Sequence, residues 1–293
     1  MKPGDGWISR TRNISGEPMK TYGFEIVDDA FIRQYISQHP EKDYVLIDVR
    51  QPQEYLQEHI PGAMLIPLPE LSAKASGLPK DKDFIFYCKS GARSQTAAMM
   101  TAESKVTDKN IYNLKGGIMA WNDMTLDGFP KVQAFDRAKA LPEFLLLAMN
   151  MEKGADRFYR EISRRYSGKS LAGVFENLAA VETAHAKMIY GFYKNFAESA
   201  PPAFDAFYEA LDGKVIEGGE SLESMMLALE GLTDNVCWDL MDLALEMEFT
   251  AFDLYRTLAN QTTHDAAMSS AFLTIAQAEK SHMRMIADAL GEC

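Results

Sequence analysis

The second half of the chain contains one pattern of acidic and histidine residues twice, and this repeat limits the fold more than any other feature. Each copy has a Glu on one helical segment and a Glu-x-x-His motif on the next. The six residues are Glu152, Glu182, His185, Glu248, Glu279 and His282. Residues three, four and seven apart share one face of a helix, and all four Glu interrupt apolar faces of this kind. The repeat therefore predicts four helices that direct carboxylates into one core.

Long segments with a period of 3.6 residues and few β-branched runs mark these helices. We expect them at 142–166, 171–198, 235–260 and 265–290. Short polar breaks join the first helix to the second and the third to the fourth, whereas the long segment 199–233 separates the two pairs. One long crossover between two helical hairpins predicts an all-α, ferritin-like four-helix bundle.

Four carboxylates buried together would repel one another and take up protons unless cations offset their charge. Two divalent metal ions balance four carboxylates and leave His185 and His282 as neutral ligands. A mixture of carboxylate and imidazole suits iron, with manganese or zinc as alternatives. We therefore predict that all six residues of the repeat are metal ligands, and we expect no organic cofactor.

At these residues the region 140–290 resembles rubrerythrin, within the wider ferritin-like di-iron group. The resemblance implies two irons that cycle between the ferrous and ferric states while peroxide or oxygen is reduced. It also implies that Glu182 and Glu279 are the bridging ligands.

Two differences separate this region from ordinary rubrerythrins. Rubrerythrins usually carry a further ligand Glu three residues after the third-helix Glu, and here that position is Ala251. They also usually carry a four-cysteine module that delivers electrons, and this chain has no Cys-x-x-Cys motif. The electron donor is thus an unidentified partner. Tyr159 and Tyr255, each seven residues beyond a Glu of the repeat, either donate hydrogen bonds to the ligands or pack in the core, and we favour packing.

The first half alternates short apolar runs with helical patterns. The apolar runs are 44–47, 64–66, 84–87 and 110–112, and the helical segments are 28–38, 52–58, 94–103 and 117–124. Continuous apolar runs are typical of strands buried on both faces of a sheet. This order predicts an α/β domain with a mainly parallel five-stranded sheet.

Cys88 follows the buried run 84–87 and precedes a helix. Backbone N–H groups and the positive end of a helix converge at such a position, where they lower the pKa of a thiol and hold anions. We assign catalytic roles to Cys88 and to the neighbouring cation Arg93. The other residues expected to line this loop, which binds the substrate or an anion, are Lys89, Ser90, Gly91, Ala92 and Ser94.

The motif Cys-x-x-Gly-x-Arg at 88–93 resembles the active-site loop of rhodaneses, and the stretches 46–50, 59–63 and 114–121 agree. The resemblance covers 22–130. It implies that Cys88 takes sulfane sulfur from a donor such as thiosulfate or a persulfide and passes it to a thiol acceptor. A cysteine phosphatase is the alternative, but those enzymes place five residues between Cys and Arg, and this loop has four.

Some residues near these motifs have no predicted chemical step. Asp48, Arg50 and Glu54 are expected to be scaffold. Three cysteines cannot form a disulfide framework and fit a reducing compartment. Cys237 is expected to pack in the bundle core, and Cys293 to be a terminal free thiol.

The formal net charge is −12 and the acidic excess lies in the second half, which disfavours nucleic acid as a partner. No run is long enough to span a membrane, and residues 1–20 lack the apolar run of a secretion signal. We expect a cytoplasmic protein that assembles as a homodimer.

We expect four regions: a flexible segment at 1–20, a rhodanese-like domain at 21–131, a linker at 132–140 and a rubrerythrin-like bundle at 141–293. The leading hypothesis is a bifunctional redox protein. It would couple sulfur transfer through a Cys88 persulfide to a non-haem di-iron site that reduces peroxide or oxygen. The alternative is a sulfurtransferase regulated by, or scaffolded on, an iron-binding bundle.

Overall fold

A computed structural model of the chain describes residues 23–293 apart from 137, 139, 198 and 233–235. The segment 1–20, predicted to be flexible, lies outside the described residues. The chain divides into two compact units, Met1–Gly128 and Phe129–Cys293. Among the described residues, none of the helices combines the length and apolar character that a membrane span requires.

The first unit contains a five-stranded sheet in the order β1-β5-β4-β2-β3, and every pairing in it is parallel. The strands are β1 (Glu25–Val27), β2 (Tyr44–Asp48), β3 (Met64–Leu65), β4 (Asp83–Tyr87) and β5 (Ile111–Leu114). β2 is buried along its whole length, and β4 along all but its first residue. The parallel sheet predicted from continuous apolar runs is confirmed.

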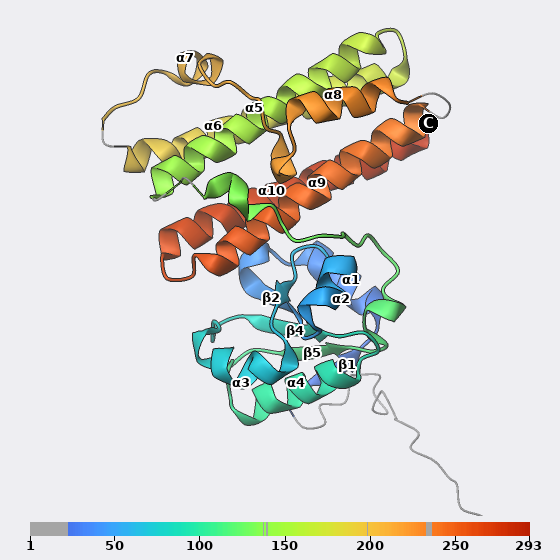
Figure 1. The fold of residues 1–293 in the computed structure, drawn as a ribbon, viewed down its shortest axis with the longest axis vertical. Helices are drawn as coiled ribbons and strands as arrows, with labels where there is room; N and C mark the ends of the chain where they lie inside the picture. The colour runs from blue at the N-terminus through green and yellow to red at the C-terminus, as the bar shows by residue number, and fades with distance from the viewer. Residues whose placement is uncertain (1–22, 137, 139, 198, 233–235) are drawn as a thin grey trace, which may run out of the picture. The chain divides into compact units, whose positions relative to one another are not determined.

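Helices cover both faces of this sheet (Figure 1). α1 (Asp29–Gln38) and α2 (Pro52–Gln57) pack on one face, and α3 (Leu71–Lys74) and α4 (Ala92–Glu103) on the other. Three short 3₁₀ turns lie in the connections: η1 (Glu41–Asp43), η2 (Leu68–Glu70) and η3 (Ala75–Gly77). The expected helix 117–124 is only the 3₁₀ turn η4 (Gly117–Ala120), because the backbone turns extended at Trp121.

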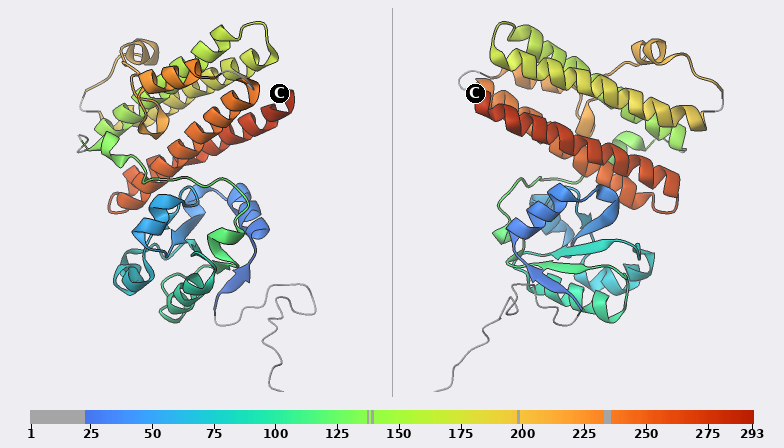
Figure 2. Two further views of the ribbon diagram at one scale, coloured as in Figure 1. Left: turned by 45° about the vertical axis from the view of Figure 1, so that its right-hand side comes forward. Right: turned by 180° about the vertical axis from the view of Figure 1, so that it is seen from behind.

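The second unit is built on four long helices, α5 (Leu141–Arg165), α6 (Ser170–Phe196), α9 (Val236–Gln261) and α10 (Ala266–Ala289). α5 packs along α6, α9 along α10, and α10 also contacts α6 (Figure 2). Pro142 lies in the first turn of α5, where its missing N–H costs nothing. The Asp265 carboxylate caps α10 by accepting a hydrogen bond of 3.0 Å from the Met268 N–H. The predicted ferritin-like bundle with one long crossover is confirmed.

The crossover is itself structured. It contains α7 (Phe204–Glu209), the 3₁₀ turn η6 (Glu217–Gly219) and α8 (Leu222–Glu230). α8 lies beside α5, and η6 packs against both α5 and α9.

The segment 132–140, expected to be a linker, begins with the 3₁₀ turn η5 (Val132–Phe135). Phe135 is 2% exposed and stacks on Phe144 with 5.7 Å between the ring centroids. The start of this segment therefore belongs to the bundle core, because an aromatic side chain there buries its apolar surface against α5.

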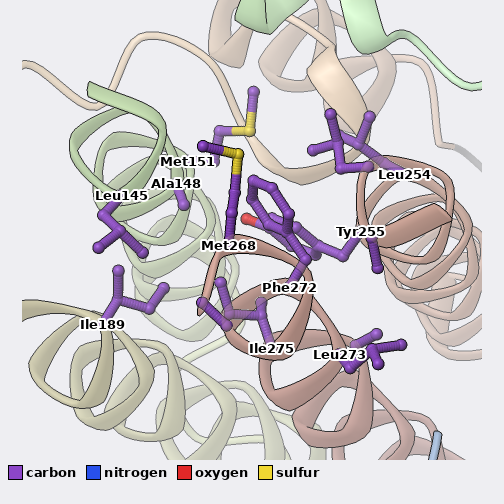
Figure 3. Packing of buried hydrophobic residues seen from close by; sticks show 14 of the residues in the cluster. Leu145, Ala148, Met151, Ile189, Leu254, Tyr255, Met268, Phe272, Leu273 and Ile275 are labelled. Atoms are coloured by element: carbon purple, nitrogen blue, oxygen red, sulfur yellow. The ribbon is translucent and has the colours of Figure 1, made fainter. Parts of the chain in front are cut away.

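Two apolar clusters fill the bundle. One draws on all four long helices, as Figure 3 shows for Leu145, Ile189, Tyr255 and Phe272, and each of these is 0% exposed. The other lies further along the helices and includes Phe158, Phe175, Leu240 and Ile286. On each helix the Glu of the repeat falls in sequence between a residue of one cluster and a residue of the other. An acidic layer is thus closed between two apolar ones.

The predictions for two of the cysteines were wrong, because a disulfide joins Cys237 to Cys293. Cys237 lies half-buried near the start of α9, and Cys293 follows the 3₁₀ turn η7 (Leu290–Glu292) after α10. Antiparallel packing of α9 and α10 brings the start of one to the end of the other, and spacing along the chain does not reveal this. Cys88 is the free cysteine.

Candidate functional site

Cys88 lies at the carboxyl end of the central strand β4, directly before the turn into α4. Its Sγ accepts hydrogen bonds from the Gly91 N–H at 3.1 Å and from the Ser94 hydroxyl at 3.4 Å. Gly91 is the N-cap of α4 and has a φ of +95°, a conformation that favours glycine. The loop therefore turns N–H donors and the start of a helix towards the sulfur.

The loop after β5 forms a second wall of this site. The Ile118 N–H donates to the Cys88 carbonyl at 2.8 Å, and the Met119 N–H donates to the Lys89 carbonyl at 3.2 Å. A Cβ at Gly117 would lie 2.2 Å from the Cys88 carbonyl oxygen, and the φ of Gly117 is +60°. Gly117 of the 114–121 motif is thus required for the approach of one loop to the other.

Burial raises the pKa of the Cys88 thiol, but hydrogen bonds from the Ser94 hydroxyl and the backbone N–H groups of Ser94, Ser90 and Gly91 outweigh burial. The net pKa is lower than that of an ordinary cysteine. Hydrogen bonds to the charged form produce such a shift, and the thiolate is the nucleophilic form of cysteine.

The remaining loop residues fall into two groups. Gly91 and Ser94 are buried against the sulfur, whereas Lys89, Ser90 and Ala92 expose their side chains at the rim. Arg93 is half-buried and is held from outside the loop by Glu54, whose two carboxylate oxygens each accept a hydrogen bond of 2.7 Å from its guanidinium.

The pairing of Glu54 with Arg93 was missed in the sequence. Arg93 holds the pKa of Glu54 down to about 2, and Glu54 in turn raises the pKa of Arg93, as does the charge of the Cys88 thiolate. Glu54 therefore orients a cation of the site and is more than scaffold. Asp48 and Arg50 do form a buried ion pair, at 2.7 Å, and Arg50 also donates to the Glu58 carbonyl.

The bundle brings the six residues of the repeat together. Glu152, Glu182, Glu248, Glu279 and His282 are 0% exposed, and His185 is 8% exposed. The His185 and His282 ring centroids lie 4.4 Å apart. Side chains from four helices thus meet in one buried layer.

Most of the polar atoms in this layer have no hydrogen-bond partner among the described residues. The unpartnered atoms are both carboxylate oxygens of Glu152, Glu182 and Glu279, the Nδ1 of His185 and the Nε2 of His282. Buried polar atoms are nearly always satisfied, and an unpaired buried charge costs several kcal/mol. So many free acceptors in one place fit a set of donors to metal cations.

Ligand-type atoms of these residues form groups whose members lie within 4.8 Å of one another. One group is Glu152, His185 and Glu279, and another is Glu248, Glu279 and His282. Glu279 belongs to both, and Glu182 forms a further group with His185 and His282. Glu152, His185 and His282 also belong to two groups each, so the groups overlap and form one continuous cluster of ligand-type atoms.

For Tyr159 the structure supports the hydrogen-bonding alternative and not packing alone. Its hydroxyl donates a hydrogen bond of 2.5 Å to one oxygen of Glu248, whose other oxygen lies 3.0 Å from the Nδ1 of His282. Burial and the charge of Glu248 raise the pKa of Tyr159, so the phenol keeps its proton. Tyr255 is buried as expected, and its hydroxyl has no hydrogen-bond partner among the described residues.

The pKa values of the acidic layer are shifted because several carboxylates are buried close together. Burial, and then the neighbouring carboxylates, raise the pKa values of Glu152 and Glu279 well above the ordinary range. Burial, and then His282, lower the pKa of His185 to about 3. Burial alone would lower the pKa of His282, but Glu182 and Glu248 raise it above its ordinary value. Protein groups alone leave this charge unbalanced.

One acidic residue of the layer was not predicted. Glu217, on η6 in the crossover, is 1% exposed, and one of its oxygens lies within 4.8 Å of ligand atoms of Glu152 and Glu182. Because Glu217 stands on no long helix and in no copy of the repeat, its spacing gave no signal.

Comparisons with known proteins divide the chain in the same way. The family model described as a Rhodanese-like domain matches residues 33–124, and that described as Rubrerythrin matches residues 143–228. The second match covers the first helical hairpin and most of the crossover, and it ends before α9.

Similar proteins align with the first unit. A protein named sulfurtransferase from Allochromatium vinosum is 39% identical over 80 residues, which are 27% of this chain and 73% of that protein. The thiosulfate:glutathione sulfurtransferase of Saccharomyces cerevisiae is 30% identical over 125 residues, covering 38% of this chain and 84% of its own. Among solved structures, a rhodanese-related protein from Thermoplasma volcanium is 27% identical, covers 35% of this chain and 98% of its own, and has a TM-score of 0.31.

Proposed function

The chain belongs to the rhodanese-like family through its first unit and carries a rubrerythrin domain in its second; from this premise we propose that Cys88 transfers sulfane sulfur and that two irons in the bundle reduce peroxide or oxygen. Sulfurtransferase relatives support the first activity. The buried carboxylate and histidine groups support the second.

The main support for sulfur transfer is the set of hydrogen bonds that the Cys88 Sγ accepts. The thiolate attacks the outer sulfur of thiosulfate, the S–S bond breaks, and sulfite leaves with the electron pair. The donors that hold the thiolate, at Gly91 and Ser94, also suit the negative outer sulfur of a Cys88 persulfide. An acceptor thiolate then takes that sulfur and restores the Cys88 thiolate.

The main support for two metal ions is the set of buried carboxylate oxygens without a hydrogen-bond partner, because two cations would offset their charge. Glu152, Glu182, His185, Glu248, Glu279 and His282 would hold the two ions, with Glu152 beside His185 in one ligand group and Glu248 beside His282 in another. Bound iron would supply the two electrons that convert one peroxide into water. Iron is preferred to manganese or zinc because the rubrerythrin match implies it.

The residues of this chain have proton-handling roles around the ions. Tyr159 donates to one oxygen of Glu248 and so orients this carboxylate, whose other oxygen lies 3.0 Å from the Nδ1 of His282. The raised pKa of His282 means that cations must displace its proton before it can ligate, so metal loading should release protons. The apolar clusters on either side exclude bulk water from the reacting groups.

Electrons would come from sulfur chemistry in the first unit. Two thiols that join in a disulfide release two electrons and two protons, which is the number that one peroxide takes up to become two waters. We assign one of the two sulfur groups, as a thiol or a persulfide, to Cys88, since the described residues offer no other free cysteine. The second thiol would come from the acceptor.

Three measurements test the proposal. Anaerobic loading with Fe²⁺ should give two irons per chain, and oxidation should give visible ferric absorption that zinc cannot produce. Peroxide should be consumed repeatedly when thiosulfate and a thiol are supplied; a single oxidation without turnover would instead support a sensor bundle. Equal peroxide consumption by Cys88→Ala would disprove the coupling and leave both separate activities standing.

A further inference from the structure

The crossover sends a short hairpin into the bundle. Val215 and Ser221 form an antiparallel bridge, and the Ile216 N–H donates to the Glu220 carbonyl at 2.8 Å. The tip of this hairpin is η6, which packs against both α5 and α9 (Figure 1). Glu217 is the first residue of that tip.

Two glycines, one on α5 and one in the hairpin itself, allow the hairpin to approach both helices. A Cβ at Gly154 of α5 would lie 2.3 Å from the Val215 carbonyl oxygen. A Cβ at Gly218 would lie 2.5 Å from the Cγ2 of Thr250 on α9, and the φ of Gly218 is +76°. Side chains at these two positions would push the hairpin away, so the close approach of Glu217 depends on both glycines.

The two Glu residues of the hairpin have opposite surroundings. Glu220 is exposed and pairs with Lys131. Glu217 is 1% exposed, and neither of its oxygens has a hydrogen-bond partner among the described residues. A carboxylate placed in this way by the backbone, with no protein donor to satisfy it, costs several kcal/mol unless a cation does.

Glu217 also points at the acidic layer. One of its oxygens lies within 4.8 Å of ligand atoms of both Glu152 and Glu182. Carboxylates at such distances repel strongly in a low dielectric, and no Lys or Arg ion pair to any of the three occurs among the described residues. The same two residues are candidate ligands of the ion next to His185.

We propose that Glu217 is a seventh protein ligand of the metal pair, contributed by the crossover to the ion held by Glu152. This inference rests on the proposed metal site. Five carboxylates exceed the charge of two divalent cations, so Glu217 also favours the trivalent state and lowers the reduction potential of the pair.

Glu217→Gln keeps the shape and removes the charge, and Glu223→Gln is the matched control, because Glu223 is an exposed acid in the same crossover. Each full-length variant is titrated anaerobically with Fe²⁺ and separately with Zn²⁺. Glu217→Gln should weaken binding of one of the two ions about tenfold or more and raise the reduction potential of the iron pair. Glu223→Gln should match the wild type in both.

The melting temperature of the metal-free protein distinguishes two roles for Glu217, a metal ligand or an acid that stabilises the fold. If Glu217 is a ligand, Glu217→Gln removes an unbalanced buried charge, so the metal-free variant should melt at or above the wild-type temperature while gaining less from added metal. A lower melting temperature without metal, together with two ions bound at wild-type affinity, would overturn the inference. Glu217→Asp, which keeps the charge but shortens its reach, should bind with intermediate affinity and serves if the Gln variant does not fold.

Wild-type protein that binds neither ion would sink the proposed di-metal function itself. Wild-type protein that binds two ions, with Glu217→Gln indistinguishable from it, would remove Glu217 from the ligand set and leave the other six in place.

Discussion

The two candidate sites solve opposite electrostatic problems. Around Cys88 the protein supplies donors, since Gly91 and Ser94 both donate to one sulfur. In the bundle it supplies acceptors, and most of their atoms find no donor among the described residues. The first site is complete as the chain builds it, whereas the second is balanced only when cations arrive. A site made of donors selects anions and a thiolate; a site made of buried acceptors selects metal ions.

This difference predicts how the stability of each unit changes when its ligand binds, which is the substrate for the first unit and metal ions for the second. Substrate should stabilise the first unit only by the small amount that its own binding supplies, because the hydrogen bonds of the Cys88 loop are made within the protein. The bundle should be markedly stabilised by metal, because binding removes charge repulsion from the folded state.

The largest expected effect is at Cys88. Cys88→Ser should lower thiosulfate-dependent sulfur transfer by about a thousandfold or more, because residues 88–94 contain no other thiol and a serine hydroxyl is a much weaker nucleophile. Iron content and the ferric absorption should stay at wild-type values. Loss of iron from this variant would break the comparison, since it would make the two sites interdependent in structure.

Glu279→Gln tests the acceptor site at a buried carboxylate that belongs to two of the ligand groups. We expect both ions to bind about a hundredfold more weakly, measured by metal titration. The metal-free variant should be at least as stable as the wild type in thermal unfolding, because the cost of burying this carboxyl, whether charged or protonated, is gone. A variant that loses stability without metal and keeps both ions would contradict the acceptor-site interpretation.

Glu54→Gln sharpens the role of the ion pair beside the thiol. Without its bidentate partner Arg93 should be less well oriented, and sulfur transfer should fall about tenfold. The folded-state pKa of Glu54, about 2, lies below its ordinary value, so the stability it contributes is present above about pH 4.5 and lost as the pH falls towards 2. The Gln variant should therefore lose less melting temperature than the wild type over that range.

Ser94→Ala should have the smallest effect. It removes one donor from the Cys88 Sγ and so raises the thiol pKa, since that bond favours the thiolate. Sulfur transfer should fall a few-fold near neutral pH and recover as the pH is raised, with the thiolate followed by its ultraviolet absorbance. Thr96→Ala, an exposed hydroxyl on the same helix, is the control and should change neither quantity.

The sequence predicted the fold and the two family resemblances well, because both depend on short-range patterns. Two family models confirm the fusion of rhodanese-like and rubrerythrin regions. Contacts between residues far apart in the chain could not be predicted from the sequence. The pairing of Glu54 with Arg93 and the hydrogen bond from Tyr159 to Glu248 join different elements. The disulfide between Cys237 and Cys293 joins the two ends of a hairpin.

By itself the sequence determined the parallel sheet, the four long helices, the thiol at a strand end and the six acidic or imidazole groups on apolar faces. Each of these follows from periodicity or local spacing, which can be read from the order of the residues. Only the tertiary structure decided which groups meet. Ala251 provides no ligand oxygen on α9, and the crossover hairpin brings the Glu217 carboxylate to the same acidic layer instead. Its approach depends on close packing at Gly154 and Gly218, and no pattern along the chain reports that packing.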